Sequence, residues 1–237
     1  MKTIILAAGR STRMYPITLK YPKCLLELKP GKTIIEHQVE MLNKCGIKDV
    51  IVIVGYLKEK IQEVLKNKVR YKTFNDFVKY NNLHTLYSIK YELNDDLIIL
   101  YSDVIFGEKM LRNMLSNKED FCLLVHNKEI LKGTARVRIK DNSVYDIGNH
   151  IPVEEGDGNF IGIAKFSKKG AKVLVKEMAK MVKDEKHNNS YYIIAIIEIA
   201  KRKRISYEVT GNELWIEIDF LKDYERAKKE IYPLVKQ

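Results

Sequence analysis

Small and basic residues gather in one loop near the start of the sequence. Residues 6–14 read Leu6-Ala7-Ala8-Gly9-Arg10-Ser11-Thr12-Arg13-Met14, and Pro22-Lys23 follow further on. Small side chains let backbone N–H groups approach phosphate oxygens, and Arg10, Arg13 and Lys23 can add charge-assisted hydrogen bonds. Because residues 3–7 predict a buried strand, the loop leaves the carboxyl end of that strand, where open α/β sheets bind ligands. The pattern predicts a phosphate-binding loop; the alternative is an ordinary strand-to-helix turn with solvated basic side chains.

Two carboxylates are predicted near the ends of strands. Asp103 comes just after the apolar run over residues 97–100, so we expect it at the same edge of the sheet as the loop. Mg²⁺ prefers one or two carboxylates together with phosphate oxygens, although an aspartate at a strand end can also cap the following turn. A second acid, Asp219, ends an alternating segment that predicts Trp215, Glu217 and Asp219 on one face of a strand.

The loop resembles the signature of the nucleotidyltransferases that activate sugar phosphates, phosphocholine and related phosphomonoesters. That signature reads roughly Leu-Ala-Ala-Gly-x-x-Ser/Thr-Arg-Met/Leu and continues with Pro, Thr and Pro-Lys, positions that Pro16, Thr18 and Pro22-Lys23 take here. The family also carries an aspartate after an apolar strand and a later Trp-x-Glu-Ile-Asp pattern. The resemblance implies that Asp103 and Asp219 bind Mg²⁺ and that Arg13 and Lys23 are catalytic. It further implies a nucleotide site formed by Leu6, Ala7, Ala8, Gly9, Arg10, Ser11, Thr12 and Ser102.

A polar segment in the middle of the chain bears on the choice of nucleotide. Residues 74–88 resemble the Asn-Pro-x-Tyr-x-x-x-Asn-Asn-x-x-Ser-Leu segment of cytidylyltransferases that act on phosphocholine and small phosphonates, although Asp76 and Thr85 replace the Pro and Ser of that pattern. Asn81 and Asn82 are amides that can donate and accept, as reading a pyrimidine edge requires, or they can cap a helix. The resemblance implies a CTP-dependent enzyme that joins CMP to a small phosphomonoester. The alternatives are a sugar-1-phosphate uridylyl-, thymidylyl- or guanylyltransferase and a catalytically silent nucleotide-sensing protein.

The acceptor side is predicted from the second half of the sequence. Residues 159–163 resemble the family's polar-x-x-Gly-Ile strand, which implies that the acceptor lies against Gly162. Tyr191 and Tyr192 stand where phosphocholine enzymes place aromatic residues, but isoleucines follow instead of the expected acid, and the pair can equally be core residues. Trp215 and Glu217 are also assigned to the acceptor, although a tryptophan is often a core residue and Glu217 can be an outer partner of the metal or solvated.

Alternation of apolar runs and helical patterns predicts the fold class. Residues 50–54 read as a buried strand, and a capping box of Thr33 and Glu36 predicts a helix that begins after Thr33. Such βαβ alternation predicts a parallel sheet, while the alternating pattern from residue 135 predicts an antiparallel ribbon on the acceptor side. We predict one α/β, Rossmann-like domain over 1–237, with a mixed, mainly parallel sheet, a nucleotide-binding half (1–125) and an acceptor-binding half (126–237). Further elements are expected at 24–28 (strand), 190–201 (helix), 214–218 (strand) and 221–231 (helix).

Composition excludes several other classes. The 237 residues carry a formal net charge of +11 with a pI near 9.3. Nucleic acid is not expected as a partner, because the lysines are scattered and the dense run at 201–204 lies where a helix is predicted to end. No apolar stretch approaches the roughly twenty residues of a membrane span, and the three isolated cysteines predict neither a disulfide framework nor a zinc site. We therefore expect a cytoplasmic enzyme without membrane insertion, and the sequence is compatible with a homodimer.

Overall fold

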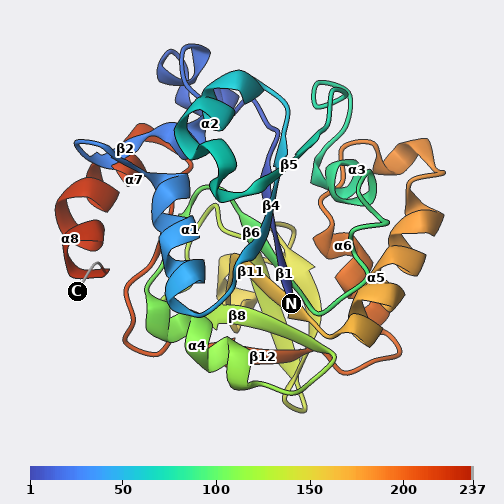
Figure 1. The fold of residues 1–237 in the computed structure, drawn as a ribbon. Coiled ribbons are helices and arrows are strands. Elements are labelled where there is room, and N and C mark those ends of the chain that lie inside the picture. The colour runs from blue at the N-terminus through green and yellow to red at the C-terminus, as the bar shows by residue number, and fades with distance from the viewer. Residues whose placement is uncertain (236–237) are drawn as a thin grey trace.

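The central strand of the fold is β1 (Lys2–Ala7), which pairs in parallel with β4 (Asp49–Val54) and with β6 (Leu97–Tyr101). The computed structural model, which describes residues 1–235, continues this sheet beyond β4 through β5 (Arg70–Thr73), again in parallel. Strands β1, β4 and β6 are near-continuous apolar runs because helices cover both of their faces, whereas the edge strand β5 is polar and partly exposed. The predicted parallel arrangement of the first half is confirmed (Figure 1).

The second half of the chain completes the same sheet with antiparallel pairs. Strand β11 (Gly158–Phe166) runs antiparallel to β6 and to β8 (Phe121–His126), and β12 (Ser206–Val209) joins β8 in parallel. The hairpin of β9 (Arg136–Lys140) and β10 (Ser143–Gly148) is the predicted ribbon. Strand β9 pairs antiparallel with the first two residues of β11. A mixed sheet flanked by helices is therefore confirmed, and the two halves of the sequence interlock within it.

The alternation of side chains along β1 sends them into two apolar layers. Ile5 and Ala7 pack in one layer, whereas Ile4 and Leu6 pack in the other. The first layer is covered by three helices: α1 (Ile34–Lys44), α2 (Lys58–Leu65) and α4 (Glu108–Ser116). The second is covered by three others: α3 (Asn82–Tyr87), α5 (Lys168–Met181) and α6 (Ile193–Ala200).

Helix α1 begins as its sequence predicts. The Thr33 hydroxyl accepts from the Glu36 N–H at 3.3 Å, and the Glu36 carboxylate accepts from the Thr33 N–H at 3.0 Å. This reciprocal pair satisfies two backbone donors that the first turn leaves without partners. The capping box is confirmed.

Several local elements differ from the predictions. Instead of one strand over 24–28, the chain forms a 3₁₀ turn at Lys23–Leu25 and then β2 (Glu27–Lys29), which pairs with β3 (Lys32–Thr33). Helix α3 was not predicted. The predicted last helix is divided into α7 (Leu221–Arg226), a π turn (Ala227–Ile231) and α8 (Tyr232–Val235). The remaining short 3₁₀ turns lie at Thr12–Met14, Ile17–Leu19, Lys66–Lys68, Val153–Glu155 and Glu185–His187.

A second, small sheet holds the end of the chain against the first half. Strand β13 (Ile216–Glu217) pairs antiparallel with β7 (Val104–Ile105), which directly follows the turn after β6. Apolar side chains from both segments, including Ile105 and Ile216, pack in a third cluster beneath the C-terminal helices. Within residues 1–235, no helix combines the length and the apolar character that crossing a membrane requires.

Candidate active site

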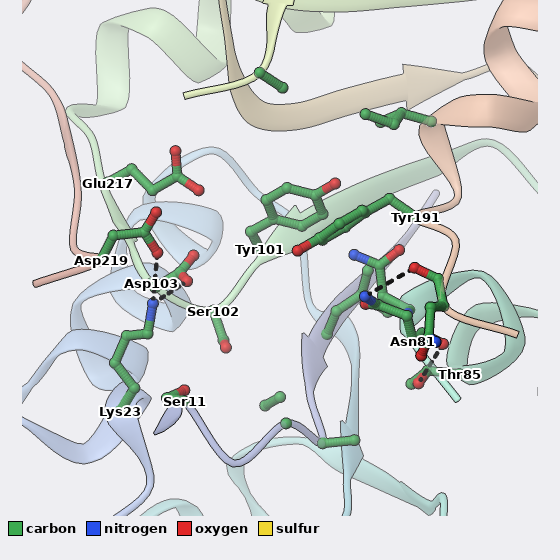
Figure 2. A pocket seen from close by; sticks show the side chains of 18 of the residues that line it. Ser11, Lys23, Asn81, Thr85, Tyr101, Ser102, Asp103, Tyr191, Glu217 and Asp219 are labelled. Carbon is green, nitrogen blue, oxygen red and sulfur yellow. Dashed lines mark hydrogen bonds and ion pairs between the residues drawn. The ribbon is translucent and has the colours of Figure 1, made fainter. Parts of the chain in front are cut away.

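A cavity of about 660 Å³ opens at the carboxyl ends of β1 and β6 (Figure 2). One wall is the loop after β1, where Leu6, Ala7, Ala8, Gly9 and Ser11 line the cavity. The opposite wall contains Ser102 and Asp103, which follow β6. The loop and the first predicted metal ligand therefore share one edge of the sheet, as the strand order of an open α/β sheet requires.

Three carboxylates meet at one side of this cavity. Oxygen atoms of Asp103, Glu217 and Asp219 lie within 4.8 Å of one another, and Figure 2 shows the three side chains converging. The small sheet brings them together, because Glu217 on β13 lies opposite Val104 on β7 and the Ile218 N–H donates to the Asp103 carbonyl at 3.0 Å. The prediction placed Glu217 with the acceptor or outside the metal ligands; the structure places it within the carboxylate cluster.

Two cations neutralise part of the cluster. The Lys23 ammonium donates to Asp103 Oδ2 at 2.7 Å, to Asp219 Oδ1 at 3.2 Å and to the Ile218 carbonyl at 2.5 Å. Arg13 forms a two-pronged ion pair with Asp219, at 2.9 and 2.8 Å. Burial alone would lower the pKa of Lys23, but the nearby carboxylates of Asp103 and Asp219 outweigh it, so the pKa is raised. Lys23 is thus a fixed positive charge at the bottom of the cavity, only 8% exposed.

The chemistry of the cluster fits a hard divalent cation. Asp103 Oδ1 is buried and has no hydrogen-bond partner among residues 1–235, so one carboxylate oxygen is left for a ligand. Burial, together with the charges of Asp103 and Asp219, raises the pKa of Glu217 to about 8. Three carboxylates in one cluster repel one another, and a cation relieves that repulsion. Asp103, Glu217 and Asp219 therefore form a cluster that could hold a divalent metal ion.

The loop after β1 is held open toward the cavity. Ser11 adopts a left-handed backbone conformation with φ of 52°, and its carbonyl accepts from the Thr18 hydroxyl at 2.9 Å. A side chain built on Gly9 would meet no protein atom within 4 Å, so its backbone is uncovered. Two predicted nucleotide-binding residues lie outside the cavity lining: Thr12 in its 3₁₀ turn, and Arg10, which donates to the Tyr15 hydroxyl at 2.8 Å.

The paired amides line the cavity and also contact the rest of the chain. Asn81 caps α3, and its Nδ2 donates to the Asn189 carbonyl at 3.2 Å. Asn82 Oδ1 accepts from the Tyr192 N–H at 2.7 Å, and the same side chain is hydrogen-bonded to the Tyr101 hydroxyl. Helix capping and presentation to the cavity thus occur together, and the chain contacts fix the orientation of both amides.

Three residues assigned to the acceptor lie outside the cavity lining. Tyr192 is fully buried and packs edge-on against Tyr101, with ring centroids 5.9 Å apart. Gly162 has φ of +79°, and a Cβ there would lie 2.8 Å from Tyr101 Cδ2, so the absence of a side chain accommodates the tyrosine ring. Trp215 is buried beside His126 and faces a neighbouring cavity of about 450 Å³. Of the five residues predicted to bind the acceptor, Tyr191 and Glu217 line the main cavity and these three do not.

The structure shows which residues of the predicted ribbon and of α6 line the cavity. Residues of the β9–β10 hairpin and of α6 also line the cavity. The hairpin was predicted, but its position over the cavity depends on the pairing of β9 with β11, which no local pattern specifies. The added lining residues are Ala135, Ile147, Gly148, Asn149, His150, Ile194 and Ile197.

Comparisons with known proteins agree with this geometry. The model of the MobA-like NTP transferase domain matches residues 3–180. The chain is 27% identical to the CTP:phosphoglutamine cytidylyltransferase of Campylobacter jejuni, over 95% of this chain and 98% of that protein. It is 32% identical to the choline-phosphate cytidylyltransferase of Streptococcus pneumoniae, over 97% of both chains.

Similarity to a solved structure extends over the same length. The CTP:phosphocholine cytidylyltransferase from Streptococcus pneumoniae superposes with a TM-score of 0.83 at 28% sequence identity, covering 96% of this chain and 97% of that one. The family model spans most of the sequence, including the loop after β1 and Asp103. The chain therefore belongs to the MobA-like NTP transferase domain family.

Proposed function

We propose that this nucleotidyltransferase is a Mg²⁺-dependent cytidylyltransferase that transfers CMP from CTP to a small phosphomonoester. The products would be a CDP-linked compound and pyrophosphate. The observation that carries the proposal is the convergence of Lys23, Arg13 and three carboxylates beside an open phosphate loop. The preference for CTP is supported by the similarity to two cytidylyltransferases, one of phosphoglutamine and one of choline phosphate.

The reaction needs no protein base. An oxygen of the acceptor phosphate, already ionised at neutral pH, attacks the α-phosphorus of CTP in line; the bond from the α-phosphorus to the bridging oxygen breaks, and its electron pair leaves with pyrophosphate. Catalysis then consists of positioning and of stabilising negative charge. Lys23 would neutralise charge at the α-phosphate, and Arg13 would hold the leaving pyrophosphate.

The loop after β1 and the carboxylate cluster have separate tasks in this scheme. Backbone N–H groups around Gly9 and Ser11 would bind the phosphates of CTP. Asp103, Glu217 and Asp219 would hold Mg²⁺, which when bound supplies a Lewis acid for the phosphate oxygens. Asn81 and Asn82, whose orientations are fixed by the chain, would read the edge of the cytosine ring.

A sugar-1-phosphate nucleotidyltransferase is the competing function, and a substrate matrix separates the two. Purified protein with Mg²⁺ is incubated with each of CTP, UTP, GTP, ATP and dTTP against phosphocholine, glycerol 3-phosphate, 2-aminoethylphosphonate and glucose 1-phosphate. Pyrophosphate release and the mass of the nucleotide product are measured. We expect CTP to give the highest kcat/KM with a non-sugar acceptor. Highest turnover of UTP or dTTP with glucose 1-phosphate would overturn the proposal, as would absence of turnover in every pair.

A further inference from the structure

One wall of the cavity, beyond the carboxylate cluster, combines apolar side chains with an absence of lysine and arginine among its described residues. It is formed by α6 and the β9–β10 hairpin and is continuous with the cavity that contains Asp103 and Lys23. We propose that this wall binds the tail of the acceptor, and that it selects a tail that presents carbon to α6 and carries no negative charge. This inference rests on the proposed function, because it takes the substrate phosphate to lie at the carboxylate cluster.

Helix α6 is apolar on two faces. Ile193, Ile196 and Ile199 are buried in the core, as expected for one face of a helix. Ile194 and Ile197, one turn apart on another face, are only half-buried and line the cavity. Among the residues of α6, only Glu198 is charged.

A half-buried apolar face that lines a cavity is stabilised when a ligand covers it. Single exposed apolar side chains are ordinary at a protein surface, but here Ile194 and Ile197 line one cavity together with the half-buried Ala135 from the hairpin opposite. Ile147 of the same hairpin also lines the cavity but is only 1% exposed, so the accessible apolar surface belongs to the other three residues. Carbon atoms of a ligand would remove this surface from water, and burial of one methyl-sized group is worth about a fourfold gain in affinity. The wall therefore favours methyl- or methylene-bearing tails.

Charge in the cavity is distributed unevenly. Among the described lining residues, the cations are Arg13 and Lys23, and both are already paired with Asp103 or Asp219. The polar groups of the far wall are Tyr191, Asn149 and His150. His150 is itself paired with Asp146, whose carboxylate lies 3.0 Å from its Nε2.

An anionic tail would therefore enter without a counter-charge. The two lining cations, Arg13 and Lys23, are matched by the carboxylates of Asp103 and Asp219, so the lining offers no spare positive charge, and Mg²⁺, when bound, would offset the charge of the substrate phosphates. Placing a further negative charge against an apolar wall carries a desolvation cost that no lining cation offsets. A neutral or cationic tail avoids that cost.

Two matched pairs of probes test the two parts of the inference. Glycerol 3-phosphate carries a neutral hydroxymethyl group at the position where 3-phosphoglycerate carries a carboxylate. Phosphocholine and phosphoethanolamine have the same tail charge but differ by three methyl groups. Isothermal titration of each into the full chain, saturated with Mg²⁺ and a non-hydrolysable CTP analogue, reports binding without turnover. We expect glycerol 3-phosphate to bind at least about tenfold more tightly than 3-phosphoglycerate, and phosphocholine at least about fourfold more tightly than phosphoethanolamine.

A charge variant locates the effect at α6. Ile194→Lys should reduce the ratio of the affinities for glycerol 3-phosphate and 3-phosphoglycerate at least about tenfold, because it places a cation beside the tail of the acceptor. Ala200→Lys adds the same charge to the same helix outside the cavity lining and should leave the preference unchanged. Equal affinities within the wild-type pairs, tighter binding of 3-phosphoglycerate, or no binding of any probe would overturn the inference. Selective binding without product formation would instead contradict the proposed function alone.

Discussion

The ammonium of Lys23 lies 2.7 Å from Asp103 Oδ2, and this pair joins two segments that are 80 positions apart in the chain. Lys23 comes from the segment after the phosphate loop, while Asp103 follows the central strand β6. The contact sets a positive charge beside the residues proposed to hold the metal. It means that substitution of either residue alters both the charge of the cluster and the position of its partner.

Removal of either predicted metal ligand should abolish catalysis and preserve the fold. Asp103→Ala and Asp219→Ala should each lower turnover by about two orders of magnitude or more, because the remaining carboxylates would hold Mg²⁺ poorly. The measurement is pyrophosphate release over a range of Mg²⁺ concentrations, with circular dichroism to verify folding. Glu63→Ala, which removes an exposed carboxylate on α2, serves as the control. Near-wild-type rates at saturating Mg²⁺ would contradict the assignment of these ligands.

Replacement of Lys23 should affect the transition state more than nucleotide binding. In Lys23→Ala, kcat should fall more than the KM for CTP rises, since charge at the α-phosphate grows in the transition state. Steady-state kinetics with CTP as the varied substrate separates the two terms. Lys118→Ala, at an exposed position in the loop after α4, should change neither. If only KM changes, Lys23 is an anchor for the ground state.

Selection of cytosine should depend on the amides at the start of α3. We expect kcat/KM for CTP to exceed that for UTP by about ten- to hundred-fold, because a wrong base leaves buried polar groups unpaired. Asn81→Ala and Asn82→Ala should reduce this ratio. Because Asn82 also accepts from the Tyr192 N–H, its variant needs a thermal melt to distinguish lost stability from lost selectivity. An unchanged ratio in both variants would assign the reading of the base to other groups.

The position of Gly162 predicts a loss of stability on substitution. Gly162→Ala places a methyl group against the Tyr101 ring in a backbone conformation that L-residues rarely adopt, which should cost about 1–3 kcal/mol of unfolding free energy. Urea denaturation measures the loss, and Gly211→Ala, with similar positive φ but no atom within 4 Å of the new Cβ, isolates the contribution of Tyr101. Equal losses in the two variants would show that the backbone conformation alone is responsible.

Acid should destabilise the protein in part through His37. Its Nε2 lies 2.9 Å from the Phe106 carbonyl, and burial lowers its pKa below the ordinary value of 6.5. In the unfolded chain the imidazole takes up a proton below about pH 6.5, whereas in the folded chain it stays neutral to lower pH, so the free energy of unfolding falls as the pH drops through this range. Urea denaturation from pH 8 to pH 5 should show a smaller loss in His37→Gln, which keeps a donor but does not titrate. A parallel loss in both proteins would contradict the role of His37.

Features that depend on neighbouring residues in the sequence were predictable. The capping box at Thr33 and the apolar strands β1, β4 and β6 follow from local patterns and appear where those patterns place them. The opening loop and Asp103 follow β1 and β6 at one edge of the main sheet, as their apolar runs predict. The metal-binding roles of Asp103 and Asp219 were predicted from the resemblance to the nucleotidyltransferases, and Asp219 follows β13 of the small sheet. The alternating pattern placed Trp215 on the same strand face as Glu217 and Asp219. It could not predict that the Trp215 side chain is buried.

Features that depend on packing between distant segments were not predictable. Tyr191 and Tyr192 are adjacent and identical, yet Tyr191 lines the cavity and Tyr192 lies in the core. The difference arises because the Tyr192 ring packs against Tyr101, which is distant in sequence. Glu217 joins the carboxylate cluster through the pairing of β13 with β7, a contact of only two residues from each strand. Helix α3 was missed because six residues carry too little periodic pattern to be distinguished from a loop.

The large sequence separation between Lys23 and Asp219 has a consequence for synthesis of the protein. The two residues are 196 positions apart, and Asp219 enters the cluster only through the small sheet of β13 and β7. A chain emerging from the ribosome therefore exposes its phosphate loop, Lys23 and Asp103 long before the last carboxylate exists. A nascent chain that has released Lys23 and Asp103 but not β13 therefore lacks Glu217 and Asp219, and the proposed metal site is complete only after Asp219 has left the ribosome.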